Sequence, residues 1–145
     1  MIVAGIPHSI AALIFYALWT IALVLMVGTD RVLEVMRGQA KLTSFTPGTP
    51  HGSDSYWRIN LAHLNATENL PIFGAIVLAG WAAGAETPLF NQLAVIVLAG
   101  RIVQSIIHIL SGSAVAIGLR FTAYGVQLIC EIWMALLILH AAHVF

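Results

Sequence analysis

Long apolar stretches alternate with short polar connections along this chain of 145 residues, and this pattern predicts four helices. A helix needs about 20 mostly apolar residues to cross a bilayer. Four segments meet this length, at roughly residues 7–28, 55–84, 88–110 and 119–143, and the first helix is expected to continue toward Gln39. The connection 43–54, rich in Pro, Gly, Ser and Thr, is expected to be an exposed loop. We therefore expect one domain, residues 1–145, folded as an all-α bundle of four transmembrane helices.

The composition defines the class of protein. The chain is 60% hydrophobic and only 8% charged, whereas soluble domains carry roughly 25% charged residues. This composition indicates an integral membrane protein. The net charge is zero and the six Lys and Arg residues are scattered, which excludes a basic surface for nucleic acid. Cys130 is the single cysteine, so no disulfide can form within the chain.

The positive charges predict the orientation of the chain in the membrane. They flank the long loop or begin the fourth segment, on the same side: Arg31, Arg37, Lys41, Arg58 and Arg120. The opposite ends carry Glu86 and no Lys or Arg. The positive-inside rule then places the long loop in the cytoplasm and both termini outside. No targeting extension is recognisable, so we expect a multi-pass protein of a bacterial inner membrane.

The second segment enters the membrane with an unusual run of polar residues, YWRINLAHLNATENLPIF at 56–73. A helix advances about 100° per residue, which sorts these residues onto two faces. One face carries Arg58, Asn65, Glu68 and Asn69, and the other carries Tyr56, Asn60, His63 and Thr67. Polar side chains are costly in lipid, so this helix is expected to contact at least two neighbours, or one neighbour and a water-filled cleft.

The third and fourth segments each carry a single polar stripe. On the third, Arg101, Gln104, Ser105 and His108 share one face; on the fourth, Arg120, Tyr124, Gln127 and Glu131 do. The first segment has only Tyr16 and Thr20 close together. It is therefore expected to be a peripheral helix.

The depth of three charged residues predicts a cluster inside the membrane. Glu68, Arg101 and Glu131 lie roughly 15–18 Å from the cytoplasmic end, and a buried arginine must be paired. We expect Arg101 to pair with Glu68, Glu131 or both. For the amides and hydroxyls of the stripes the alternative is purely structural contact between helices, at about 0.6 kcal/mol each. Arg120 and Tyr124 lie at the cytoplasmic mouth of their stripe, where water can reach, which favours a functional role.

Other kinds of site are not indicated. His63 and Glu68 are five residues apart and diverge on a helix, so no metal site is expected. Asp30 and Asp54 are expected to fall in loops, which would leave no partner for a Ser-His-Asp triad. The internal repeats and broken helices typical of transporters are not visible.

The polar residues of the last three segments resemble the MAPEG family, membrane-associated proteins in eicosanoid and glutathione metabolism. The family signature is a His-x-Asn-x-x-Glu core followed by Pro and Phe, which here are His63, Asn65, Glu68, Pro71 and Phe73. An arginine on the third helix and an Arg with a Tyr four residues later on the fourth match Arg101, Arg120 and Tyr124. The segment GQAKL at 38–42 is similar to the family's cytosolic extension of the first helix. The resemblance covers nearly the whole chain.

This resemblance implies a homotrimer that binds glutathione between neighbouring protomers, near the cytoplasmic face. Arg120, with Tyr124, would stabilise the glutathione thiolate, which attacks a lipophilic electrophile or reduces a hydroperoxide. Lys41 and Arg58 would attract its carboxylates, while Asn65 and Glu68 would hold its amide and ammonium groups. The remaining residues expected to bind glutathione are His63, Arg101, His108 and Gln127. Membrane lipids are the other expected partners.

Three positions depart from the family pattern. Leu61 and Leu64 stand where family members that bind glutathione well often carry arginines, and His108 replaces a common tyrosine. Fewer cations attract an anionic tripeptide less strongly. The alternative interpretation is therefore a non-catalytic trimer of the same fold, acting as a lipid-binding or scaffold protein with weak or no glutathione binding.

Overall fold

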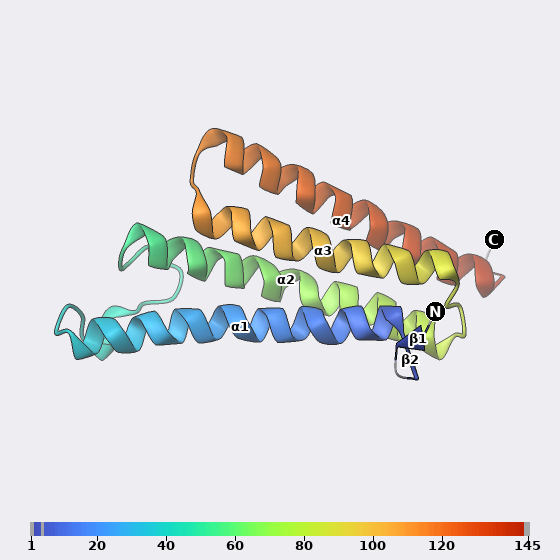
Figure 1. Ribbon diagram of the computed structural model, residues 1–145, viewed down its shortest axis with the longest axis horizontal. Helices are drawn as coiled ribbons and strands as arrows, with labels where there is room; N and C mark the ends of the chain where they lie inside the picture. The colour runs from blue at the N-terminus through green and yellow to red at the C-terminus, as the bar shows by residue number, and fades with distance from the viewer. Residues whose placement is uncertain (1, 4, 144–145) are drawn as a thin grey trace.

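The computed structural model describes residues 2–3 and 5–143 and consists almost entirely of four helices (Figure 1). These are α1 (His8–Met36), α2 (Asp54–Ala82), α3 (Pro88–Leu110) and α4 (Ala114–Ala141). A short hairpin of β1 (Ile2–Val3) and β2 (Ile6–Pro7) precedes α1, and a 3-10 turn, η1 (Leu42–Ser44), lies in the long loop. The prediction of an all-α bundle with four helices is confirmed.

The helix starts follow from capping residues. Ser53, Thr87 and Ser113 each accept a hydrogen bond from a backbone N–H in the first turn of α2, α3 and α4, which satisfies donors that have no partner in the helix. Ser113 explains why α4 begins at Ala114 rather than at the predicted 119. The residues after this cap are mostly apolar and extend the helix by more than a turn.

Three helices, α1, α3 and α4, are long and apolar enough to cross a membrane, with mean hydropathies of 2.6, 2.1 and 1.7, within the part of the chain described. α2 has 29 residues, which is about 43 Å of helix, but its first half carries the polar residues noted above. Two helix connections, 37–53 and 111–113, lie at one end of the bundle (Figure 1). The termini and the connection 83–87 lie at the other end.

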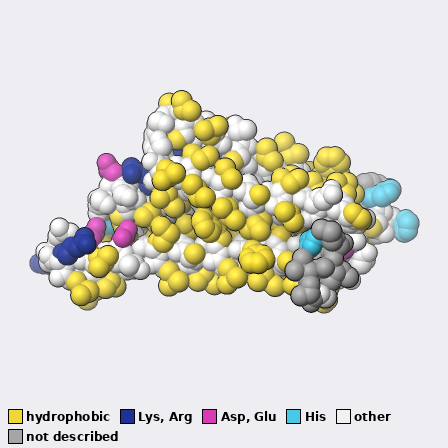
Figure 2. Space-filling view, viewed as in Figure 1, with side chains coloured by type: hydrophobic (Ala, Val, Ile, Leu, Met, Phe, Trp, Pro, Cys, Tyr) yellow, Lys and Arg dark blue, Asp and Glu magenta, His cyan; other side chains and the backbone are white. Residues whose placement is uncertain are grey.

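The surface is apolar along the helices and charged at one end of the bundle (Figure 2). Hydrophobic side chains cover the middle of the visible face, while Lys, Arg and acidic side chains gather at the end with the long loop. Large apolar side chains exposed along α1, α3 and α4 include Leu25, Val103 and Ile132. This is the surface expected of a bundle whose sides are covered by lipid.

The packing corrects the expectation that the first helix is peripheral. α1 packs along both α2 and α3, whereas α4 packs mainly on α3 and touches α2 less. Tyr16 is fully buried and stacks on Phe73 of α2, with ring centroids 5.5 Å apart. Its hydroxyl donates to the carbonyl of Ala66, at 3.2 Å. The expectation failed because an apolar helix face has the same sequence pattern whether it contacts lipid or another helix.

Candidate functional site

A polar cleft of about 400 Å³ opens between α2, α3 and α4, near the end of the bundle that carries the long loop. We define the polar cleft by the eight residues that line it: Leu61, Asn65, Gln104, His108, Ile117, Arg120, Phe121 and Tyr124. Each of the three helices contributes a polar residue from a stripe predicted in the sequence. Polar residues from all three predicted stripes therefore line the same hollow.

The cleft has a positive character. Arg120 lines it, and the Nε of this residue is buried without a hydrogen-bond partner among the described residues. Arg58 lies beside the cleft, where its Nε donates to the Ile109 carbonyl. The lining residues include no carboxylate. An anionic group entering the cleft would therefore meet the guanidinium of Arg120 and no negative side chain.

Two contacts hold the α2 wall of the cleft against α3. Arg58 Nε donates to the carbonyl of Ile109, at 3.1 Å, which satisfies an acceptor in the last turn of α3. The side-chain amide of Asn65 lies 3.4 Å from His108 Nδ1. Asn65 of α2 and His108 of α3 thus contact each other at the cleft wall. Arg58 of α2 makes a second contact between the two helices, at the last turn of α3.

Arg101 lies behind the cleft and joins it to the core of the bundle. Its side chain is 1% exposed. Nη1 donates to the Asn65 carbonyl, at 3.1 Å, and the guanidinium carbon lies 5.6 Å from the ring centroids of both Tyr16 and Tyr124. These are cation–π distances. Arg101 thereby contacts three helices and fixes the ring of Tyr124 at the cleft wall.

The predicted pairing of Arg101 with Glu131 is not formed as an ion pair within the described residues. Glu131 is buried, and its Oε1 accepts from Asn69 Nδ2 at 2.7 Å. Arg101 makes its hydrogen bond to the Asn65 backbone instead. Arg101 Nε and Nη2, and Glu131 Oε2, have no partner within the described residues.

Glu68 does not join this cluster. It is exposed on the protomer, whereas Asn69 is 2% exposed. Adjacent residues differ by about 100° around a helix axis, and this step separates the inward-facing Asn69 from the outward-facing Glu68. The predicted pairing of Arg101 with Glu68 is therefore wrong within one protomer.

Gln127 supports the cleft from the α4 side. It is fully buried, and its Nε2 donates to Gln104 Oε1 and to the Ala123 carbonyl, both at 3.0 Å. Gly100 allows this close approach, since a Cβ there would lie 3.0 Å from Gln127 Cγ. Gln127 thus positions Gln104 rather than lining the hollow itself.

The structure brings together only some of the predicted site residues. Asn65, His108, Arg120 and Tyr124 line the cleft, and Arg58, Arg101 and Gln127 contact or adjoin its walls. Lys41, His63 and Glu68 are not among the lining residues; Lys41 and Glu68 are exposed elsewhere on the protomer. The sequence analysis missed Ile117 and Phe121, since apolar residues near a helix start carry no signal for a site, and it missed the role of Tyr16.

A bundle of four helices with apolar sides and a polar cleft near one end defines an integral membrane protein. The family model for the MAPEG family matches residues 9–140, nearly the whole chain. The chain therefore belongs to the MAPEG family, as the resemblance indicated. No curated protein matches the chain in a comparison of sequences.

Proposed function

We propose that this protein binds glutathione in the polar cleft and uses it against lipophilic electrophiles or hydroperoxides. The observation that carries the proposal is the convergence of Arg120, Tyr124, Asn65 and His108 on one hollow from three helices. Family membership supports it, because the resemblance to this family implies glutathione chemistry. The polar stripes therefore have a use beyond joining the helices.

Arg120 is the residue that would hold the reacting sulfur. A free thiol has a pKa near 8.5, and an adjacent guanidinium lowers it, so that more of the nucleophilic thiolate forms at neutral pH. The buried Nε of Arg120 has no partner among the residues described, which leaves this donor available. Tyr124 shares the cleft wall, and its hydroxyl can donate a second hydrogen bond to the thiolate.

The transfer step would be a nucleophilic substitution or addition. The thiolate sulfur attacks the electrophilic carbon and forms a carbon–sulfur bond. In a substitution the leaving group departs with its electron pair, and in an addition the π electron pair moves onto the activating group and is protonated by water. Ile117 and Phe121 provide an apolar side to the cleft, and Phe121 is 78% exposed. A lipophilic substrate could therefore reach the sulfur directly from the bilayer.

The rest of glutathione would contact polar groups around the sulfur site. Asn65, His108 and Gln104 offer partners for the peptide amides, Gln127 positions Gln104, and Arg58 attracts a carboxylate. Arg101 would act from behind, through Asn65 and Tyr124.

A homotrimer is part of the same proposal. Glu68 is exposed on α2 at a position that the sequence predicts to lie within the membrane, and a carboxylate facing lipid is costly. A neighbouring copy that covers this face would shield Glu68 and allow it, with His63 and with Lys41 from the loop, to complete a glutathione site between protomers. The positive residues near the long loop support a cytoplasmic position for that end, with both termini outside.

One observation favours a second candidate, a lipid-binding or scaffold trimer without catalysis. Leu61 lines the cleft where many glutathione-binding members carry arginine. The missing cation weakens the attraction for a peptide with two carboxylates.

Turnover of a generic electrophile separates the two candidates. Detergent-purified protein would be assayed for conjugation of glutathione to chlorodinitrobenzene. Arg120→Gln is expected to lower kcat/KM by at least tenfold, while Arg37→Gln, a matched change at an exposed residue outside the cleft, should leave it unchanged. Absence of both turnover and glutathione binding in the unaltered protein would support the scaffold and contradict the enzyme.

A further inference from the structure

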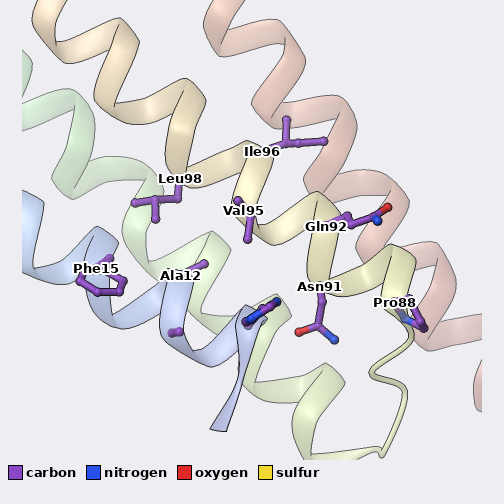
Figure 3. Close-up of a pocket in the computed structure, with 10 residues that line it drawn as sticks. Ala12, Phe15, Pro88, Asn91, Gln92, Val95, Ile96 and Leu98 are labelled. Carbon is purple, nitrogen blue, oxygen red and sulfur yellow. The ribbon is translucent and has the colours of Figure 1, made fainter. Parts of the chain in front are cut away.

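A second hollow lies on a different face of the bundle, between α1 and α3 at the end that carries the termini (Figure 3). Its volume is about 800 Å³. Residues of α1 form one wall and residues of α3 the other, with Phe15 and Val95 on opposite sides. Polar side chains occur at the end near the termini, where His8, Asn91 and Gln92 line the hollow.

The hollow continues along the same two helices. A neighbouring hollow of about 460 Å³ shares Phe15 and Leu98 with the first and extends to Ala22 and Ile102. From His8 to Ala22 is 14 residues, or about 21 Å of helix. We call the two hollows together the α1–α3 groove. It is longer than half the roughly 30 Å hydrocarbon core of a bilayer.

The mouth of the groove is held by hydrogen bonds that join α1 to the start of α3. The backbone N–H of Ser9 donates to Asn91 Oδ1 at 2.7 Å, and Asn91 Nδ2 donates to the Thr87 carbonyl at 3.1 Å. The hydroxyl of Ser9 also donates to Glu86. Ser9 is fully buried. These contacts fix the two walls relative to each other, so the groove exists before any ligand binds.

The groove and the polar cleft lie on different faces of the bundle. α1 and α4 lie on opposite sides of the α2–α3 contact, because α4 packs mainly on α3 and α1 packs on both α2 and α3. The polar cleft is lined by α2, α3 and α4, and no residue of α2 or α4 lines the groove. In the proposed homotrimer, the exposed Glu68 of α2 faces a second copy. No residue of α2 lines the groove, so the separation of the groove from that face rests on the proposed homotrimer.

The residues that line the groove include polar side chains near the chain termini and are apolar toward the middle of the bundle. Beyond Gln92 every lining residue is apolar, and no lining residue is Asp, Glu, Lys or Arg. This is the polarity profile of one lipid molecule lying along the helices, with its headgroup at the membrane surface and its chain in the hydrocarbon core.

We propose that the α1–α3 groove is a binding site for a phospholipid of the leaflet at the termini end. One acyl chain lies along Phe15, Val95 and Leu98, and the headgroup contacts His8 and Gln92. Because Asn91 is already engaged with Ser9 and Thr87, its role is to shape the mouth. This site is separate from the glutathione site and does not depend on it.

Trp19, which lines the inner part of the groove, provides a reporter. A variant that keeps Trp19 and carries Phe at 57, 81 and 133 would be purified free of lipid in detergent. It would then be titrated with phosphatidylcholine brominated in its acyl chains, which quenches nearby tryptophan. Quenching is expected to saturate at one lipid per protomer. A parallel variant that keeps only Trp133, half exposed on α4, should show weak quenching that does not saturate.

Variants that fill the groove with a larger side chain test whether the phospholipid binds there. Ala11→Phe and Val95→Phe fill it from opposite walls and should each weaken lipid binding at least tenfold, while Gln92→Leu should weaken it several-fold. Ala99→Phe is the matched control, because Ala99 is exposed on α3 and does not line the groove. Normal saturable binding in both filled variants would overturn the proposal. Loss of oligomers in both, with lipid binding unchanged, would also overturn it and assign the groove to a second copy.

Discussion

The guanidinium of Arg101 lies over the ring of Tyr124, with 5.6 Å between the guanidinium carbon and the ring centroid. This contact joins a fully buried cation on α3 to a partly exposed residue of the polar cleft on α4. The same guanidinium faces Tyr16 on α1 and donates to the backbone of α2 at Asn65. All four helices therefore meet at Arg101, and the geometry of the cleft depends on the polar core behind it.

Arg101→Met is expected to destabilise the protomer. Methionine fills much of the same space but removes the hydrogen bond to the Asn65 carbonyl and the cation–π contacts with Tyr16 and Tyr124. Loss of a buried charged hydrogen bond costs about 1.5–3 kcal/mol, which should lower the Tm in detergent by several degrees. Glu68→Gln should leave the Tm of the protomer unchanged and lower the yield of oligomer. An equal effect of both variants on the Tm would contradict the separation of Glu68 from the core.

Glu131 should be replaceable by glutamine but not by leucine. Glu131→Gln keeps an oxygen that can accept from Asn69 Nδ2, now at 2.7 Å. Glu131→Leu leaves the amide of Asn69 buried without an acceptor, at a cost of about 1–3 kcal/mol. Thermal unfolding followed by circular dichroism should show a small change for the first variant and a clear loss for the second. A Glu131→Leu protein as stable as the unaltered one would show that the Asn69 contact adds nothing.

Gly80 should tolerate no side chain. It lies in α2 where Phe90 of α3 crosses closely, and a Cβ at this position would collide with the aromatic ring. Gly80→Ala is expected to cost about 1–3 kcal/mol through overpacking, measured as a lower Tm. Gly118→Ala is the control, because its Cβ position lies more than 4 Å from any described atom beyond its chain neighbours and the local helix backbone, and alanine in a helix is favoured over glycine by roughly 0.5–1 kcal/mol.

Leu61→Arg should strengthen glutathione binding. Leu61 lines the polar cleft, so the substitution adds a cation that can reach a glutathione carboxylate. One charge-assisted hydrogen bond contributes about 1.5–3 kcal/mol, which corresponds to tenfold tighter binding or more by calorimetry. Met36→Arg is the matched control, because Met36 is 77% exposed at the end of α1 and does not line the cleft. An equal gain in Met36→Arg would contradict a specific contact between position 61 and a glutathione carboxylate.

The polar stripes were the part of the site that the sequence predicted best. Arg101, Gln104, Ser105 and His108 stand out on an apolar helix at one angular position, and all four are buried in the bundle. The sequence analysis wrongly predicted Glu68 in the core cluster with Arg101. Helical spacing sets the angles between residues of one helix, but it does not set the rotation of that helix relative to its neighbours. Tyr16 was missed since its neighbours on α1 are apolar, and such a face can contact either lipid or protein. Ile117, on the apolar side of the cleft, lies on α4 only because this helix begins five residues before the predicted start, after its cap at Ser113.

The most direct test of the central proposal is the ultraviolet absorbance of the glutathione thiolate on the protein. Glutathione would be added to the unaltered protein and to Arg120→Ala at neutral pH, with Arg37→Ala as the control. We predict a saturable thiolate signal in the unaltered protein and in Arg37→Ala, and at least a tenfold smaller signal in Arg120→Ala. No signal in the unaltered protein, or an unchanged signal in Arg120→Ala, would contradict a role for Arg120 in stabilising the thiolate.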